Sequence, residues 1–116
     1  MIAILCTEGQ MTHTEVRAEC TAGKWVPILV YRQGEVTTVP LFHSNRVAYN
    51  FVKRNLPADW LRGGIDLTDR DVEWIKQQGW QIEVLSFPRK MKDLTDLVFG
   101  FEILEFDEAP EVRYVR

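Results

Sequence analysis

Two apolar runs rich in β-branched and aromatic residues, at 25–31 and 36–42, are the clearest structural pattern in the chain. The four residues that separate them include Gly34, and this spacing predicts a β-hairpin. Pro27 and Pro40 lie inside the two runs. Because proline cannot donate a ladder hydrogen bond, we expect each to lie on an edge strand or at a strand end.

Further segments have the pattern of strands. The apolar run 2–6 is typical of a buried strand, and 81–87 alternates between apolar and polar positions. Alternation over 99–106 predicts a strand with Phe99, Phe101 and Ile103 on one face. Three segments are open to two interpretations: 12–20 as a half-buried strand or a short helix, 62–66 as a loop or a short strand, and 107–116 as an acidic tail or a late edge strand.

Two helices have clear boundaries. The first begins after Ser44, whose hydroxyl can cap the free amides of the first turn, and ends before Pro57. The second begins after Thr68, has acidic residues at its positive end, and stops at Gly79. A third, short helix is predicted over 90–97.

This order of elements predicts an α+β fold in a single domain over residues 1–116. We expect an antiparallel or mixed sheet of five to six strands, with two to three helices packed mainly on one face. A chain of 116 residues is long enough for one hydrophobic core and too short for two. No apolar run approaches the ~20 residues of a membrane-spanning helix, so we expect no membrane contact.

The charge balance argues against nucleic acid as a partner. The net charge is −3, and the acidic residues are concentrated toward the C-terminal end. The short basic clusters 53–54 and 89–92 do not form the long stripe that phosphate backbones require. The chain has only two cysteines and no recognisable export signal, which favours the reducing cytoplasm.

The sequence gives little support for a metal site or a catalytic site. Cys6, His13, Cys20 and His43 are the residue types that bind zinc, but they lack the close pair of ligands found in structural zinc sites. Cysteines on apolar strand faces usually behave as small hydrophobic residues. The chain contains no phosphate-binding glycine loop and no nucleophile elbow. We therefore expect no metal and no cofactor, and the sequence leans against an enzyme.

A small anionic ligand has one candidate site. His43, Ser44 and Arg46 surround the start of the first helix, where free backbone amides favour an anion. The competing interpretation is that Ser44 only caps the helix while His43 and Arg46 are solvated.

Three of the four tryptophans lie between residues 60 and 80, and tryptophan is enriched at interfaces. The candidate interface residues are Trp60, Trp74 and Trp80, together with Val112 and Tyr114 of the late strand. The leading hypothesis is a small cytoplasmic protein-interaction or regulatory module that forms a homodimer. The alternative is a binding protein or small enzyme that uses the anion site at 43–46.

Overall fold

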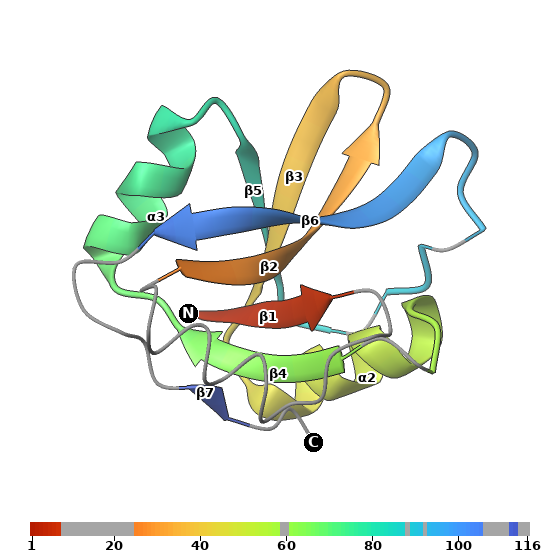
Figure 1. Ribbon diagram of the computed structural model, residues 1–116. Coiled ribbons are helices and arrows are strands. Elements are labelled where there is room, and N and C mark those ends of the chain that lie inside the picture. The colour runs from red at the N-terminus through yellow and green to blue at the C-terminus, as the bar shows by residue number, and fades with distance from the viewer. Residues whose placement is uncertain (8–24, 59–60, 88, 92, 106–111, 114–116) are drawn as a thin grey trace.

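Seven strands and two helices are present in the computed structural model, which describes residues 1–7, 25–58, 61–87, 89–91, 93–105 and 112–113 (Figure 1). The strands are β1 (Ile2–Thr7), β2 (Trp25–Gln33), β3 (Val36–Phe42), β4 (Leu61–Asp66), β5 (Gln81–Leu85), β6 (Leu97–Glu105) and β7 (Val112–Arg113). The helices are α2 (Asn45–Asn55) and α3 (Asp69–Gln77). The α+β class with a mixed sheet is confirmed.

The sheet branches at β2 (Figure 1). On one edge, β2 pairs antiparallel with β6 along its whole length. On the other edge, β3 pairs with its last three residues, while β1 meets it nearer its start, where Leu5 lies opposite Ile28. One branch continues through β1 to β4 and β7, and the other continues from β3 to the parallel strand β5.

The two prolines of the hairpin lie near the start of a strand (Pro27) and where a strand changes its neighbour (Pro40). Pro27 is near the start of β2, as expected for a strand end, although β2 itself is an inner strand. Pro40 lies between Thr38, which pairs with β2, and Phe42, which pairs with β1. A residue without an N–H group fits the stretch of β3 where one neighbour is exchanged for another.

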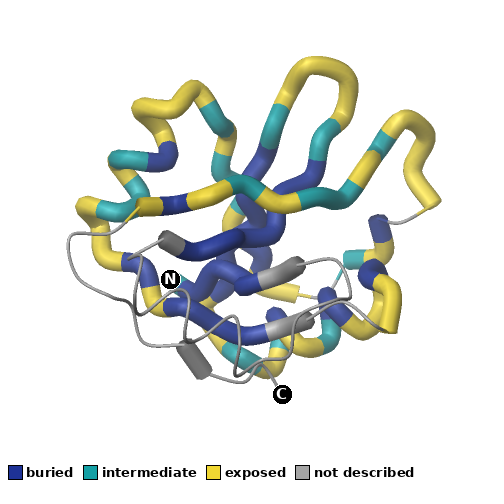
Figure 2. Tube along the Cα trace, viewed as in Figure 1, coloured by how far each residue is buried: buried dark blue, intermediate teal, exposed yellow. Residues whose placement is uncertain are grey.

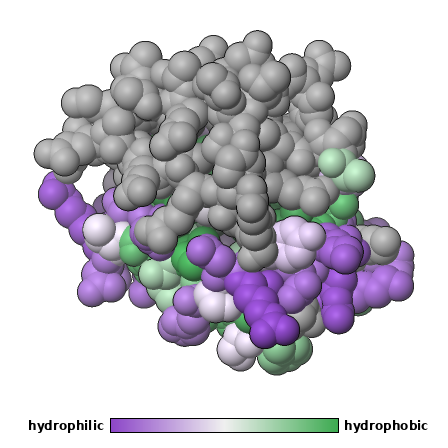
Figure 3. All heavy atoms as spheres, turned by 90° about the horizontal axis from the view of Figure 1, so that it is seen from below, coloured by the Kyte–Doolittle hydropathy of each residue, from purple (hydrophilic) through white to green (hydrophobic). Residues whose placement is uncertain are grey.

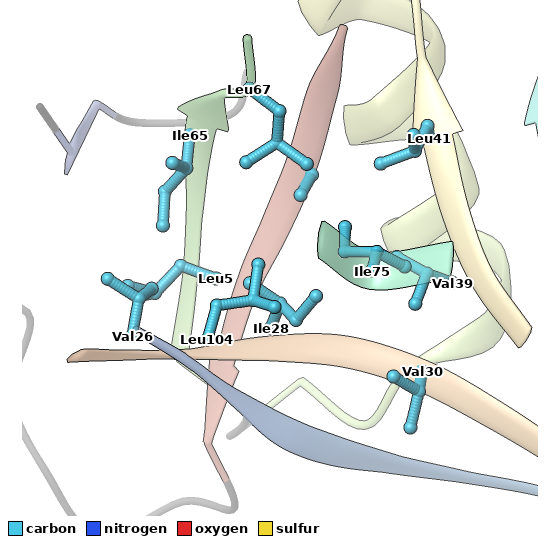
Figure 4. Close-up of a cluster of buried hydrophobic side chains, with 11 residues drawn as sticks. Leu5, Val26, Ile28, Val30, Val39, Leu41, Ile65, Leu67, Ile75 and Leu104 are labelled. Atoms are coloured by element: carbon cyan, nitrogen blue, oxygen red, sulfur yellow. The ribbon is translucent and has the colours of Figure 1, made fainter. Parts of the chain in front are cut away.

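Each face of the sheet carries its own hydrophobic cluster. The first contains Ile75 of α3 together with Ala3, Leu5, Ile28 and Val39 of the strands (Figure 4). The second contains Phe51 of α2 together with Ile2, Ile4, Leu29 and Phe42. The two helices therefore pack on opposite faces, and the expectation that they lie mainly on one face is wrong. The physical reason is visible in β1, where every residue from Ile2 to Leu5 is buried (Figure 2).

The helix ends follow the predicted capping chemistry. Ser44 Oγ accepts from the Val47 amide at 3.2 Å, and the helix ends at Asn55, with Leu56 as its C-cap directly before Pro57. Thr68 and Asp71 form a reciprocal capping box at the start of α3, and Gly79 follows it with φ +83°. On the side of the molecule where α2 lies, hydrophilic side chains predominate among the described residues (Figure 3). The outward face of α2 contributes Arg46, Lys53 and Arg54.

The prediction of a short helix over 90–97 is wrong. The described residues of this segment form turns, with i to i−3 hydrogen bonds from Leu94 to Met91 and from Leu97 to Leu94, and β6 already begins at Leu97. Met91 is buried, and its amide donates to the side chain of Asn55 in α2 instead of to a helical carbonyl. Tertiary contacts have overridden the local helical preference.

Two further segments that were open at the sequence level have definite outcomes. Residues 61–66 form a strand, and β7 is the late edge strand expected near the C-terminal end. The segment 12–20 lies outside the described residues.

We expect Phe51→Ala to lower the free energy of unfolding by about 3–5 kcal/mol, because it leaves a cavity under α2. Phe51 is fully buried, and its ring lies 5.3 Å from that of Phe42 and 6.2 Å from that of Phe99. Urea denaturation measures the loss. The control is Tyr49→Ala on the outer side of the same helix, which should cost less than about 1 kcal/mol. Equal losses for the two variants would contradict the packing described here.

Candidate functional site

A cavity of about 420 Å³ opens between the β2–β3 hairpin, β5 and the segment that follows β5. Strand register places its residues on one face of the sheet. Tyr31 of β2 lies opposite Thr38 of β3, and Glu83 of β5 lies opposite Pro40, two residues farther along β3. Because side chains two residues apart in a strand share a face, Tyr31, Thr38 and Glu83 all point into the cavity.

The cavity is built around the carboxylate of Glu83. The Tyr31 hydroxyl donates to Glu83 Oε2, and Arg89 Nη1 forms an ion pair with Glu83 Oε1. Tyr31 is buried, whereas the side chains of Glu83 and Arg89 are 32% and 40% exposed. The network is therefore anchored in the core at Tyr31 and reaches solvent at Arg89.

Burial raises the pKa of Tyr31 well above its usual value, and the hydrogen bond to the Glu83 carboxylate raises it further. Thr38 and Arg89 act in the opposite direction but do not compensate. Tyr31 is consequently a permanent hydrogen-bond donor at neutral pH. A phenol held protonated and an arginine already paired are suited to binding a ligand more than to transferring a proton.

Asn55 attaches the Arg89 side of the cavity to α2. Its amide nitrogen donates to the carbonyl of Phe51 at 2.8 Å and to that of Arg89 at 2.6 Å, and its oxygen accepts from the Met91 amide. Asn55 is buried, and its hydrogen bonds to Phe51 and Met91 are shielded from water, while the one to Arg89 is partly buried. They fix the backbone on both sides of Lys90 and thereby position Arg89 and Met91 at the cavity.

A second feature is the outer edge of β6. Among the described residues, β6 pairs only with β2, so its other edge has no neighbouring strand. We name Val98, Phe101 and Ile103 the β6 surface; these apolar side chains are 63%, 41% and 39% exposed. Arg32 of β2 lies across Gly100 to form an ion pair with Glu102. A side chain at position 100 would meet the Arg32 guanidinium, and glycine leaves this path open.

The residues of the predicted anion site lie together at the start of α2 but do not line the cavity. His43, Ser44 and Arg46 are exposed, and Ser44 caps the helix. Asn45 Oδ1 is buried there without a hydrogen-bond partner among the described residues. It is an acceptor and supplies no contact for an anion.

The predicted interface residues are scattered. The rings of Trp74 and Trp80 meet edge to face at 6.0 Å, and both are half-buried against the cluster that contains Ile75. Val112 belongs to β7, where it pairs with Ile65. Trp60 and Tyr114 lie outside the described residues. Of the predicted set, the described part of the chain brings only Trp74 and Trp80 into contact.

Sequence reasoning missed the residues of the cavity. Tyr31 and Glu83 are 52 positions apart, and no local motif connects them. Arg89 is part of a short basic cluster that is equally typical of a solvated surface. The parallel pairing of β3 with β5 brings Glu83 beside Tyr31, and the hydrogen bonds of Asn55 place Arg89 next to them.

Comparison of the chain with protein families, with curated proteins and with solved structures finds no match. No helix in the described part of the chain is long and apolar enough to cross a membrane. Within the same residues, no group of three or more His, Cys, Asp or Glu side chains could hold a metal ion. Of the four residues with side chains of zinc-binding type, His13 and Cys20 lie outside the described residues.

The raised pKa of Tyr31 gives a specific alkaline response. The unfolded chain ionises this phenol near pH 10, whereas the folded chain keeps it protonated. The contribution of the protonated phenol to the stability of the folded state is therefore complete below about pH 10 and is lost progressively as the pH rises above that value. We expect the free energy of unfolding of Tyr31→Phe to fall less steeply above pH 10, by up to about 1.4 kcal/mol per pH unit. Urea denaturation from pH 8 to about pH 11.5 measures the slopes. Tyr49→Phe is the control, and identical slopes for all three proteins would refute the assignment.

Removing the Asn55 side chain should destabilise the protein by about 2–3 kcal/mol, because Asn55→Ala leaves the buried Met91 amide and the partly buried Arg89 carbonyl without these partners. Asn50→Ala, a half-buried position on the same helix, is the matched control. Hydrogen exchange of the Met91 amide should accelerate in Asn55→Ala and stay unchanged in the control. An unchanged exchange rate in both would show that Asn55 does not hold this segment.

Proposed function

We propose that this protein is a small protein-interaction module that acts as a homodimer, joined through the free edge of β6. The observation that carries the proposal is a nine-residue edge strand with exposed apolar side chains. Long unpaired apolar edges are templates for another strand, and natural proteins usually shorten, charge or cover them. The two cysteines and the acidic balance fit a cytoplasmic location for such a module.

The sequence of β6 is complementary to itself in one antiparallel register. With Phe101 on a two-fold axis, Phe101 faces Phe101 of the second copy, and Phe99 faces Ile103. On the other face of the sheet, Val98 is opposite Leu104, and Glu102 is opposite Gly100. Cross-strand apolar pairs of this kind stabilise antiparallel sheets.

Charge supports the same register. Arg32 lies over Gly100, so Glu102 of the second copy would approach the Arg32 guanidinium. Centring the pair on Gly100 would place Val98 opposite Glu102, and centring it on Glu102 would place two carboxylates opposite each other. The arrangement centred on Phe101 avoids both and leaves one apolar–charged pair, Leu97 opposite Glu105, at the ends of the strand. Its two-fold symmetry produces a closed dimer.

This proposal moves the interface away from the tryptophans. Trp74 and Trp80 already bury part of their surface against each other and against the core. The β6 surface has no such partner among the described residues.

Native mass spectrometry should give twice the monomer mass of 13.5 kDa for the wild type and the monomer mass for Phe101→Lys. The substitution places two like charges on the symmetry axis, and we expect dimerisation at least about 100-fold weaker. Phe87→Lys is the control, because Phe87 is 61% exposed and lies outside β6. A monomeric wild type, or a Phe101→Lys variant that dimerises normally, would refute the proposal.

Cross-linking tests the register. In a background of Cys6→Ala and Cys20→Ala, Phe101→Cys should form an intermolecular disulfide. Ile103→Cys should not, because its two copies would be separated by four residues along the strand, about 13 Å. Efficient cross-linking of Ile103→Cys instead would assign a different register.

A further inference from the structure

Around Glu83 and Arg89 in the cavity, the hydrogen-bonding groups that are still free are N–H donors. Both oxygens of Glu83 are occupied, one by the Tyr31 hydroxyl and one by Arg89 Nη1. Arg89 has further N–H groups on Nη2 and Nε, and these have no acceptor among the described residues. Next to Glu83, the groups of Arg89 that are left for a ligand are therefore N–H donors.

The donors are held in a fixed position. Glu83 orients the guanidinium from one side, and the Asn55 hydrogen bonds fix the backbone on both sides of Lys90. The neighbouring basic residue Lys90 has its own partner, Asp93, at 3.1 Å. A pre-oriented guanidinium with free N–H groups matches the two oxygens of a carboxylate.

Three of the residues that line the cavity are apolar. Met91 is buried, while Leu94 and Val36 are 46% and 44% exposed. A hydrocarbon group placed there would remove the exposed side chains from water. The volume of about 420 Å³ lies within the range of small-molecule sites.

From these observations we infer that the cavity binds a small organic carboxylate with an apolar substituent. The carboxylate binds the free N–H groups of Arg89, and the substituent packs on Met91, Leu94 and Val36. Glu83 neutralises Arg89 in the empty site and so limits the affinity for an anion. This site is independent of the proposed dimer contact, because none of the three residues of the β6 surface lines it.

The probe is hexanoate, with hexanamide as its uncharged counterpart of the same shape. In a titration of ¹⁵N-labelled protein, hexanoate should produce saturable shifts in the amide signals of residues that line the cavity. Hexanamide should bind at least about tenfold more weakly, since it lacks the charge that Arg89 recognises. Arg89→Met should also weaken hexanoate binding at least about tenfold, and the control Lys90→Met should not.

A variant that is expected to bind hexanoate more tightly distinguishes a change at the site from loss of the fold. Glu83→Gln keeps one acceptor, for the Tyr31 hydroxyl, and removes the negative charge together with the ion pair to Arg89. The Asn55 hydrogen bonds still hold the Arg89 backbone, and the guanidinium is no longer neutralised, so hexanoate should bind about three- to tenfold more tightly. Loss of the fold cannot produce such an increase.

Three outcomes would overturn the inference. The first is the absence of saturable shifts at the cavity up to about 50 mM hexanoate. The second is equal binding of hexanoate and hexanamide. The third is a response confined to residues 43–46, which would assign the anion to the start of α2 instead.

Discussion

Burial of both faces of β1 and β2 is the constraint on which the rest of the structure depends. Ile2, Ile4 and Leu29 face α2, whereas Ala3, Leu5 and Ile28 face the side covered by α3. A strand that is apolar at consecutive positions is stable only when both faces are covered. The two described helices supply this cover, α2 on one face and α3 on the other.

The branching of the sheet follows from the same constraint. β3 leaves β2 after Thr38 and meets β1 at Phe42, so the space between the diverging strands is filled by the cluster that contains Val39, Leu41 and Ile75. The two helices cover the faces of the sheet but not its edges. Among the described strands, the longest free edge belongs to β6, and three of its apolar side chains are exposed.

The polar network of Tyr31, Glu83, Arg89 and Asn55 lies at the boundary of the hydrophobic cluster that α2 covers. Tyr31 is anchored in the cluster beneath α2, and its hydroxyl finds Glu83 at the boundary of that cluster. Asn55, near the end of the helix, holds the next segment in place. A buried polar group must be hydrogen-bonded to be tolerated. The same hydrogen bonds that satisfy Tyr31 and Asn55 therefore also place Arg89 beside the cavity.

Local chemistry in the sequence determined the hairpin, the two capped helices and the face of β6 shared by Phe99, Phe101 and Ile103. Each of these depends on neighbours within a few residues: a glycine-containing connection, a capping hydroxyl, or a period of two. Tertiary structure alone decided that the helices cover opposite faces, that 90–97 is not a helix, and that β6 is an edge. It also brought Tyr31, Glu83 and Arg89 together, because strand order and register depend on contacts between residues far apart in the chain, which no local pattern records.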